Sequence, residues 1–396
     1  MMSAETIGGV DLAIILGSVS AAIWLYLALF RGGFWLADQR LSAEYSQLDF
    51  WPDVAIVIPA RNEQAVIKRT LTSLQNQDYP GYLSIIVVDD NSEDRTVNEI
   101  KHSRNTKTEL LQGRPLPEGW TGKLWALQQG IDEIFSRGRS PTFLLLSDAD
   151  IIHPQKSVQQ LVLHAEESGL ELVSLMVRLN CRSKWEVILI PAFVFFFQKL
   201  YPFPWINNPS SRAAGAAGGC VLIRTATLLQ AGGLDRIKNQ VIDDCALAHL
   251  IKPHGPIWIG LTQEVISHRP YTSLKEIWNM VIRTAFDQLH HSASLLALSI
   301  ICMILTYAVP PTVFVFGVIS SNFLLIAIGS FASVIMMLCY IPTLRLYARS
   351  PIEALLLPVA ALLYTLMTLD SAQRFWRHKN PTWKGRANQP GTAGKP

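Results

Sequence analysis

Two aspartates, Asp148 and Asp150, follow the apolar run "FLLL" and are separated by one small residue. Two carboxylates this close repel each other. A divalent cation that also binds a diphosphate would remove the repulsion, since Mg²⁺ commonly takes one or two carboxylates together with phosphate oxygens. A D-x-D triplet occurs by chance roughly once in a chain of this length, so its meaning depends on where it lies.

A second acidic pair, Asp89 and Asp90, follows the apolar run "LSIIVV". One interpretation is a turn, because Asp, Asn and Ser favour turns and helix caps. The other is a ligand site, because a carboxylate at a strand edge accepts hydrogen bonds from the N–H groups of a nucleobase or from a sugar. The segment alone leaves both open.

The third pair, Asp243 and Asp244, opens the apolar stretch "CALAHL". Acids are common at helix N-termini, where they cap the helix and complement its dipole. The functional alternative is a general base, which needs a carboxylate within hydrogen-bond reach of an acceptor hydroxyl.

Two further segments could bind a ligand. Lys123 in "GWTGKLWALQQG" follows a glycine ahead of a helix, where a lysine can meet a phosphate. Taken alone, a solvent-exposed lysine at a helix start is the plainer interpretation. Gly218 and Gly219 in "AAGAAGGCVLIR" either let a ligand approach the backbone closely or are turn glycines.

These motifs must be positioned by strands that alternate with helices. "VAIVIPA", "LSIIVV" and "TFLLLS" are typical of buried strands, and helical apolar spacing separates them. This alternation predicts an α/β fold with a mostly parallel sheet flanked by helices, in which ligands bind beyond the carboxyl ends of the strands. We expect one polar domain over residues 50–290.

The composition predicts that part of the chain lies in lipid. The 396 residues are 49% hydrophobic and only 16% charged, whereas soluble proteins carry about 25% charged residues. Residues 12–30 are uncharged and long enough to span a bilayer, with Arg31 and Arg40 following them. This pattern predicts a retained anchor over residues 1–31, with the following chain in the cytoplasm. The net charge of +3 and the lack of a basic run do not favour a nucleic-acid partner.

A second apolar region of two to three transmembrane helices is predicted over residues 292–372. Residues 292–344 are uncharged and suffice for two spans, turning near residues 320–322. The stretch 353–369 is either a third span or an interfacial helix, because the tail at 373–396 is basic and should also be cytoplasmic. The aromatic segment 187–205 is either an interfacial helix or a buried core helix.

Together the motifs resemble those of the family 2 glycosyltransferases, which share the GT-A fold. The matching segments keep the family's order over about residues 52–290: they are "IPARNE", "VVDDNSEDRT", "GK" at 122–123, "SDAD", the glycine-rich loop and "DD" at 243–244. The membrane helices and "GRPLPEGWTGKLWAL" resemble, more narrowly, the bacterial hopene-associated glycosyltransferases of hopanoid gene clusters.

The resemblance implies a role for each matching position. Asp89 and Asp90 would contact the nucleotide, and Asp244 would be the catalytic base with Asp243 beside it. Asp148 and Asp150 would bind a divalent metal, Mg²⁺ or Mn²⁺, with Asp150 favoured as the direct ligand. The other residues implied to contact the donor are Pro59, Arg61, Glu63, Lys123, Asp148 and Arg283. Those implied to contact the acceptor are Gly218 and Gly219.

One departure from the family bears on the acceptor. Processive membrane-bound relatives carry Gln-x-x-Arg-Trp after the base, whereas here Met280 and Thr284 replace the Gln and Trp and only Arg283 is kept. We therefore expect an inverting single transfer from a nucleotide sugar to a hopanoid or polyprenoid-type lipid at the bacterial inner membrane. The alternatives are a processive polysaccharide synthase and a catalytically silent membrane scaffold that binds nucleotide sugars.

Overall fold

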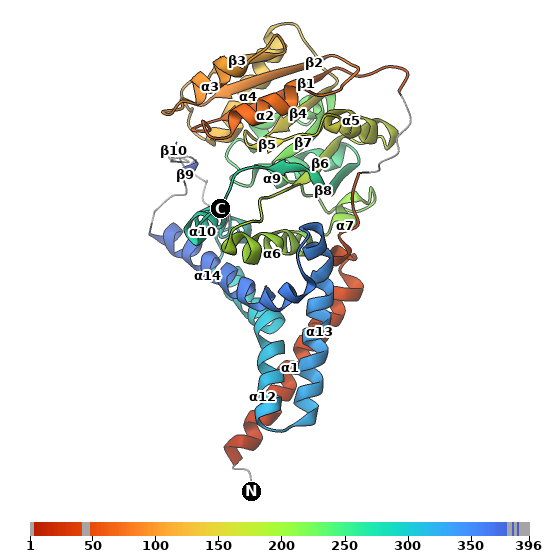
Figure 1. Cartoon of the computed structure of the whole chain (residues 1–396), viewed down its shortest axis with the longest axis vertical. Coiled ribbons are helices and arrows are strands. Elements are labelled where there is room, and N and C mark those ends of the chain that lie inside the picture. The colour runs from red at the N-terminus through yellow and green to blue at the C-terminus, as the bar shows by residue number, and fades with distance from the viewer. Residues whose placement is uncertain (1–3, 42–47, 378–381, 384–385, 388–396) are drawn as a thin grey trace. The chain divides into compact units, whose positions relative to one another are not determined.

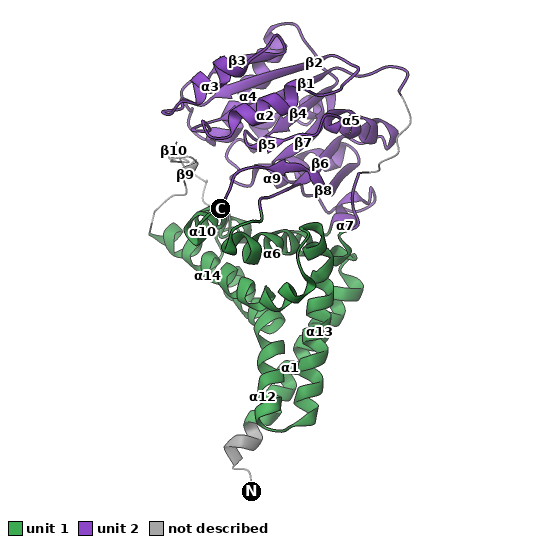
Figure 2. Ribbon diagram, viewed as in Figure 1, with its two compact units in different colours: residues 1–37, 181–202, 271–379 green, residues 38–180, 203–270, 380–396 purple. Residues whose placement is uncertain are grey.

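The computed structural model describes residues 4–41, 48–377, 382–383 and 386–387, which fall into two compact units (Figure 2). Unit 1 comprises residues 1–37, 181–202 and 271–379, and unit 2 comprises residues 38–180, 203–270 and 380–396. Residues 181–202 therefore group with the apolar helices, although they lie inside the predicted domain 50–290. The physical reason is their apolar helix, which shares a core with Trp24 and Tyr340 of unit 1.

Unit 2 contains a mixed, mostly parallel sheet (Figure 1). Its strands run in the order β3 (Thr108–Gln112), β2 (Leu83–Asp89), β1 (Val54–Ala60), β4 (Phe143–Ser147), β7 (Cys220–Arg224), β6 (Leu172–Arg178), β8 (Ile257–Ser267) and β5 (Ile151–Ile152). Strand β7 is antiparallel to both neighbours, and β5 is antiparallel to β8. The other pairs are parallel, which confirms the predicted fold class.

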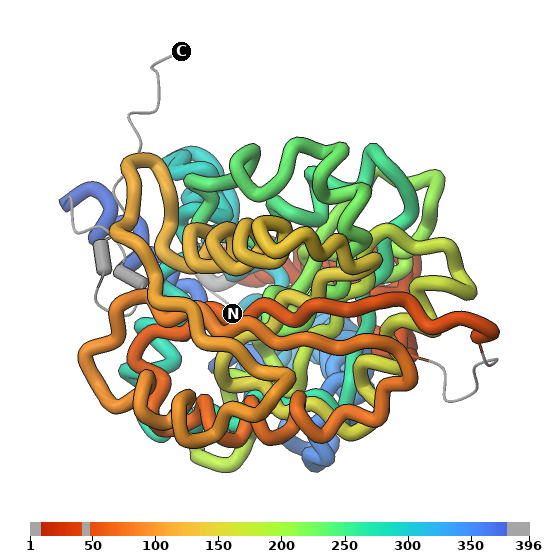
Figure 3. The backbone as a smooth tube through the Cα atoms, turned by 90° about the horizontal axis from the view of Figure 1, so that it is seen from above, coloured from red at the N-terminus to blue at the C-terminus, as the bar shows by residue number. Residues whose placement is uncertain are grey.

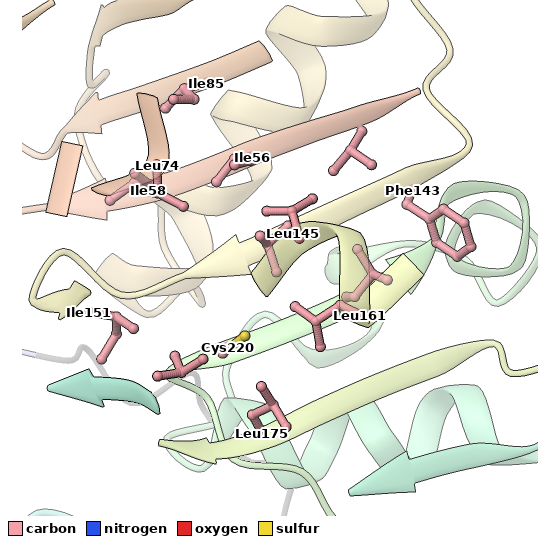
Figure 4. Close-up of a cluster of buried hydrophobic side chains, with 14 of the residues drawn as sticks. Ile56, Ile58, Leu74, Ile85, Phe143, Leu145, Ile151, Leu161, Leu175 and Cys220 are labelled. Carbon is pink, nitrogen blue, oxygen red and sulfur yellow. The ribbon is translucent and has the colours of Figure 1, made fainter. Parts of the chain in front are cut away.

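Helices cover both faces of this sheet. The core on one face joins alternate residues of the strands to α2 (Ile67–Gln75), α3 (Thr96–Ser103) and α5 (Ser157–Glu167). Figure 4 shows part of it, with Ile56, Ile58, Leu74, Ile85, Leu145 and Leu161 pointing into a common layer. Every residue of β1 and β2 is buried, as expected for parallel strands covered on both faces.

Helix α4 (Gly122–Ser136) lies on the opposite face, alongside β1 and β2 (Figure 3). Its close approach depends on Gly130, because a Cβ there would lie 2.5 Å from Cγ1 of Val57. The contact fixes α4 against β1, the strand that contains Val57. Consequently the first turn of α4, which carries Lys123, is held at a defined position on the sheet.

Shorter elements complete unit 2. Helix α7 (Phe203–Asn207) packs near β8, and α8 (Thr225–Gln230) follows β7. Helix α9 (Asp243–Ile251) begins at the predicted acid pair. The 3₁₀ turns are η2 (Leu234–Ile237) and η3 (Lys252–His254), and a two-stranded ribbon joins β9 (Thr382–Trp383) to β10 (Arg386–Ala387).

Unit 1 is helical. Its elements are α1 (Ala4–Phe30), η1 (Phe34–Leu36), α6 (Lys184–Leu200), α10 (Leu274–Ile282), η4 (Asp287–Leu289), α11 (Ala293–Met303), the π-helical turn η5 (Ile304–Ala308), α12 (Val309–Ile319), α13 (Phe323–Leu346), η6 (Pro351–Leu356) and α14 (Leu357–Trp376). Within the described residues, four helical stretches are long and apolar enough to cross a membrane: Gly9–Phe30, Ala293–Ile319, Phe323–Leu346 and Pro351–Trp376. They support membrane association.

Candidate active site

The D-x-D motif and the glycine-rich loop meet at one edge of the sheet. Asp148 comes directly after β4, whose last residue pairs with Cys220 at the start of the antiparallel β7. The backbone N–H of Asp148 donates to the carbonyl oxygen of Gly219 at 3.2 Å. Because β7 runs opposite to β4, the loop before β7 arrives where β4 ends. This register brings Gly218 and Gly219 beside the acids.

Lys123 links the D-x-D motif to the acid pair at the start of α9. Its Nζ lies 3.0 Å from Oδ1 of Asp148 and 3.1 Å from Oδ2 of Asp243. The side chain is only 19% exposed, so the interpretation as a solvent-exposed lysine is wrong. Burial alone would lower the pKa of Lys123, but Asp148 and Asp243 outweigh this effect and raise it. Lys123 is therefore a fixed cation within the site.

Asp244 is held by two backbone N–H groups. Oδ2 accepts a hydrogen bond from the N–H of Gly218 at 2.8 Å, and Oδ1 accepts one from the N–H of Cys245 at 2.8 Å. Burial and the neighbouring Asp243 raise the pKa of Asp244 to about 6, although Lys123 partly opposes the shift. A carboxylate with a pKa this close to neutrality is suited to accept a proton and return it.

Gly218 must be small because it lies between the two groups that it helps to position. A Cβ there would lie 3.1 Å from Nζ of Lys123 and 3.3 Å from Oδ2 of Asp244. These distances are tight for a carbon atom, so a side chain would push the ammonium or the carboxylate away. The predicted acceptor residue therefore also serves to orient Asp244.

Asp150 makes a different set of contacts. Its Oδ2 accepts hydrogen bonds from Oγ of Ser267 at 2.8 Å and from Nε of Arg269 at 3.1 Å. Arg269 also pairs with Glu63, with 2.5 Å between its terminal nitrogen and Oε2. Sequence reasoning did not identify Ser267 or Arg269. The available signal was their place at the end of β8, next to the edge where the acids gather.

The pair Asp89 and Asp90 lies where β2 ends and the following loop begins. The carboxylate of Asp89 accepts from the N–H of Ser92 at 3.2 Å and from Nε2 of Gln112 at 3.1 Å. Asp90 is fully buried. Arg61 donates to the carbonyl oxygens of Asp90 at 2.6 Å and Asn91 at 2.9 Å. Arg61 therefore holds the backbone of the loop that follows β2. Asp89 stabilises a turn there, which is one of the two interpretations that the sequence left open.

Six of the thirteen predicted residues line one small cavity. It has a volume of about 10 Å³, which is about the space for a single water molecule. The cavity is therefore too small to enclose a ligand much larger than a water molecule. The lining includes Pro59, Lys123, Asp148, Gly218, Asp243 and Asp244. Arg283 is instead the C-cap residue of α10 in unit 1.

A metal would need ligands from its substrate. Among the described residues, no three His, Cys, Asp or Glu side chains are grouped so that they could hold an ion. Mg²⁺ at phosphoryl sites commonly needs only one or two carboxylates, with phosphate and water oxygens completing its shell. Asp148 and Asp150 fit such a partial set, and Arg269 already neutralises the second of them.

Comparison with known proteins agrees with this geometry. The model of the family described as Glycosyl transferase family 2 matches residues 55–227. Over 152 residues the chain is 35% identical to the Probable glycosyltransferase YdaM of Bacillus subtilis (strain 168), which covers 36% of this chain and 34% of that protein. The chain thus matches about a third of the length of this curated relative.

The chain resembles two solved structures to different degrees, and the likeness in fold rests on the first of them. The mannosyltransferase PcManGT from Pyrobaculum calidifontis, in complex with GDP-Man and Mn²⁺, has a TM-score of 0.54 at 16% identity and covers 94% of this chain and 100% of that chain. TarS 1–349 of S. aureus in complex with UDP-GlcNAc has a lower TM-score of 0.36 at 15% identity, covering 83% and 92%. The family-model match and the similarity to the Probable glycosyltransferase YdaM support a transferase. Residues 55–227 thus match the model of Glycosyl transferase family 2, and the chain has a GT-A-like fold.

Proposed function

We propose that the chain is an inverting glycosyltransferase that moves one sugar from a nucleotide-diphospho-sugar to a hydroxyl of a membrane lipid. The observation that carries the proposal is Asp244, a carboxylate of raised pKa held by two N–H groups beside the Lys123 cluster. The four apolar helices support an acceptor that resides in the membrane. The resemblance to hopene-associated enzymes favours a hopanoid, with a polyprenoid-type lipid as the alternative.

In the proposed reaction, the acceptor oxygen attacks the anomeric carbon from the face opposite the diphosphate. A new C–O bond forms while the bond from that carbon to the phosphate oxygen breaks, and the nucleoside diphosphate leaves with the electron pair. Asp244 takes the proton of the acceptor hydroxyl, so no positive charge remains on the new ether oxygen. Positioned base catalysis of this kind contributes about 10²–10⁴-fold.

Lys123 and Asp243 prepare the base for this step. The ammonium pairs with Asp243 and Asp148, so the acids can lie close together without strong repulsion. It also lowers the pKa of Asp244, which keeps a larger fraction of the base ionised near neutral pH. We propose that the same ammonium faces the negative charge that grows on the departing diphosphate.

Asp148 and Asp150 would hold a divalent metal, Mg²⁺ or Mn²⁺, together with the donor's diphosphate. When bound, the metal would stabilise the charge of the leaving group as a Lewis acid. Arg269 orients the Asp150 carboxylate through its ion pair with Glu63. Glu63 thus acts on the donor site through Arg269 in this proposal.

The remaining donor contacts follow from their positions. Asp89 and Asp90 would receive the base and ribose at the end of β2, where Arg61 holds the loop. Pro59 lines the cavity at the end of β1, and Gly218 and Gly219 would face the acceptor. Arg283 would contact the diphosphate. We further propose that the chain lies in the bacterial inner membrane, with unit 2 in the cytoplasm where nucleotide sugars are found.

The test uses the full chain in lipid nanodiscs with a panel of nucleotide sugars, and release of nucleoside diphosphate is measured. We expect Asp244→Asn to lower turnover by about 10²–10⁴-fold while nucleotide binding stays unchanged. Asp235→Asn is the matched control, because Asp235 is 65% exposed and pairs only with Lys238 among the contacts of its carboxylate. Full turnover by the Asp244 variant would overturn the assignment of the base.

The acceptor is tested separately by lipid mass spectrometry of cells with and without the gene. A lipid that carries a hexose in the first cells and lacks it in the second would identify both sugar and acceptor. A ladder of products with many sugars would instead support a processive synthase. If the purified chain turns over no nucleotide sugar and no lipid differs between the two kinds of cell, the chain is a catalytically silent scaffold and the proposed enzyme is wrong.

A further inference from the structure

A group of buried polar side chains in unit 2 lies behind the turn that carries the D-x-D acids. Along the chain, Asp148 and Asp150 alternate with Ser147 and Ala149, which are only 2% and 3% exposed. Ala149 lies between β4 and β5, outside any strand, so its buried carbonyl group needs a partner from elsewhere. Whatever holds Ser147 and Ala149 therefore also sets where the two carboxylates lie.

Helix α2 supplies the partner of that carbonyl group. Oγ1 of Thr70 donates to the carbonyl oxygen of Ala149 at 2.8 Å, and Thr70 is fully buried. Its neighbours Leu71 and Leu74 pack in the core of the sheet. Burying a hydroxyl among such residues costs free energy unless it is hydrogen-bonded. The threonine thus interrupts an apolar helix face and meets the residue between the two acids.

Two further polar groups extend the contact along the same side of α2. Oγ of Ser73 accepts a hydrogen bond from the N–H of His153 at 3.1 Å. Gln77, just past the end of the helix, donates from Nε2 to the carbonyl oxygen of Pro154 at 2.7 Å. Residues 70, 73 and 77 are spaced by three and four, as neighbours on one helix face are. The D-x-D turn and the segment after it are thus tied to α2 at three points.

The imidazole of His153 holds the other side of the turn. Its Nε2 lies 2.9 Å from Oγ of Ser147, and its Nδ1 lies 3.3 Å from Oγ of Ser157, the first residue of α5. His153 is only 2% exposed, and burial lowers its pKa to about 4. The ring is therefore neutral near pH 7, and both nitrogens can hydrogen-bond to hydroxyl groups. The residue directly before Asp148 is thereby joined to α5.

The same helix also fixes a second segment of the proposed donor site. The loop of Arg61 and Glu63 leads into α2, and the N–H of Ile67 donates to the carbonyl oxygen of Glu63 at 3.0 Å. One rigid element thus holds both this loop and the D-x-D turn. Hydrogen bonds of this supporting kind usually orient the side chains that bind a metal.

We propose that Thr70 and His153 are positioning residues of the donor site. Thr70 acts through Ala149. His153 acts through Ser147. Together they set the spacing of the two D-x-D carboxylates for a divalent cation that carries the diphosphate. This inference rests on the proposed function, from which it takes the D-x-D pair as the metal site.

The test measures binding of GDP, UDP and dTDP to the full chain in lipid nanodiscs by calorimetry, with and without Mn²⁺. Thr70→Val keeps the shape of the side chain and removes the hydroxyl, whereas Thr70→Ser keeps the hydroxyl. Thr108→Val is the matched control, because Thr108 is also buried and bonds Asn105 and Gln75 on β3, three strands from β4. His153→Phe and His153→Gln form a second pair, in which only the Gln variant keeps a polar group near Nε2.

We expect Thr70→Val and His153→Phe to weaken Mn²⁺-dependent nucleotide binding by about 10- to 100-fold. Thr70→Ser and His153→Gln should recover most of that loss. The Thr108 variant should bind like the wild type, even where urea unfolding shows that it has lost as much stability as Thr70→Val. In turnover assays of Thr70→Val, the KM for the donor should rise more than kcat falls.

Equal binding by Thr70→Val and Thr108→Val would overturn the role of Thr70, and so would a Thr70→Ser variant that binds as weakly as Thr70→Val. Unaltered binding by His153→Phe would overturn the role of His153. Binding by the wild type that does not depend on Mn²⁺, or no binding of any of the three nucleotides, would overturn the inference as a whole. A wild type that binds with Mn²⁺ yet transfers no sugar would contradict only the proposed enzyme.

Discussion

At the scale of single residues, the pKa of Asp244 gives the proposed base a pH signature. Burial and Asp243 raise this pKa to about 6, above the usual value for Asp. Only the ionised form accepts a proton, so kcat/KM should fall about tenfold per pH unit below pH 6 and level off above it. This fall is the acid limb of the pH profile. It is measured as initial rates of nucleoside diphosphate release from about pH 4.5 to about pH 8, the range in which we expect the fold to be stable. A flat profile through pH 6 would contradict the assignment.

Lys123 should set the position of that limb. Its ammonium lowers the pKa of Asp244, so Lys123→Met should move the acid limb to higher pH as well as reduce turnover. Lys238→Met is the control, because Lys238 is 42% exposed and pairs with the exposed Asp235. A Lys123 variant that loses activity with an unmoved limb would show that the lysine acts on the donor and leaves the base unaffected.

The sequence identified the acids of this site better than their partners. Asp148, Asp243 and Asp244 were found because acids at strand and helix ends are visible in a local pattern. The pairing of Lys123 with Asp148 and Asp243 was missed, because it joins segments 25 and 120 residues apart that meet only through the sheet. Arg269 was missed for the same reason, since its partners Glu63 and Asp150 lie in loops that are distant from it in the sequence.

At the scale of elements, the contact of α4 with β1 should be essential for the position of Lys123. Alanine usually stabilises a helix relative to glycine by about 0.5–1 kcal/mol. Gly130→Ala should nevertheless destabilise the fold by about 1–3 kcal/mol, because its Cβ would lie 2.5 Å from Val57. Urea unfolding of the purified chain measures the loss, and turnover should fall with it as the first turn of α4 shifts.

The matched control for that change is Asp132→Ala, two residues further along α4 at an exposed position. It should leave the free energy of unfolding nearly unchanged. If Gly130→Ala is as stable as this control, α4 has room to move and does not fix Lys123. Stability lost without any change in turnover would show that the site tolerates the shift.

The elements themselves were largely predictable. The segment "VAIVIPA" coincides with β1 at both ends, and the predicted strand "LSIIVV" forms all but the last residue of β2. These runs are local, apolar and bounded by prolines or acids. The antiparallel insertion of β7 between β4 and β6 was not foreseen, because strand order depends on pairings between distant segments.

At the scale of the whole molecule, two groups of helices within unit 1 differ in character. Helices α1, α12 and α13 pack on one another along their lengths (Figure 1). Helix α14 packs instead on α6, α10 and α11. It carries Asp370, which accepts from the indole N–H of Trp278 at 2.7 Å and pairs with Arg374. An acid and a base in its second half are typical of a helix at the edge of the apolar layer.

Charge distribution favours the same conclusion for α14. Arg345 and Arg349 precede it and Arg374 and Arg377 end it, and basic residues near apolar helices favour the cytoplasmic side. A full crossing would put one of these pairs outside. We therefore predict that α14 lies in the interface, with both of its ends in the cytoplasm. Green fluorescent protein fused after residue 377 should fluoresce, whereas alkaline phosphatase fused after residue 321, in the turn between α12 and α13, should be active. Active phosphatase after residue 377 would show that α14 spans the membrane.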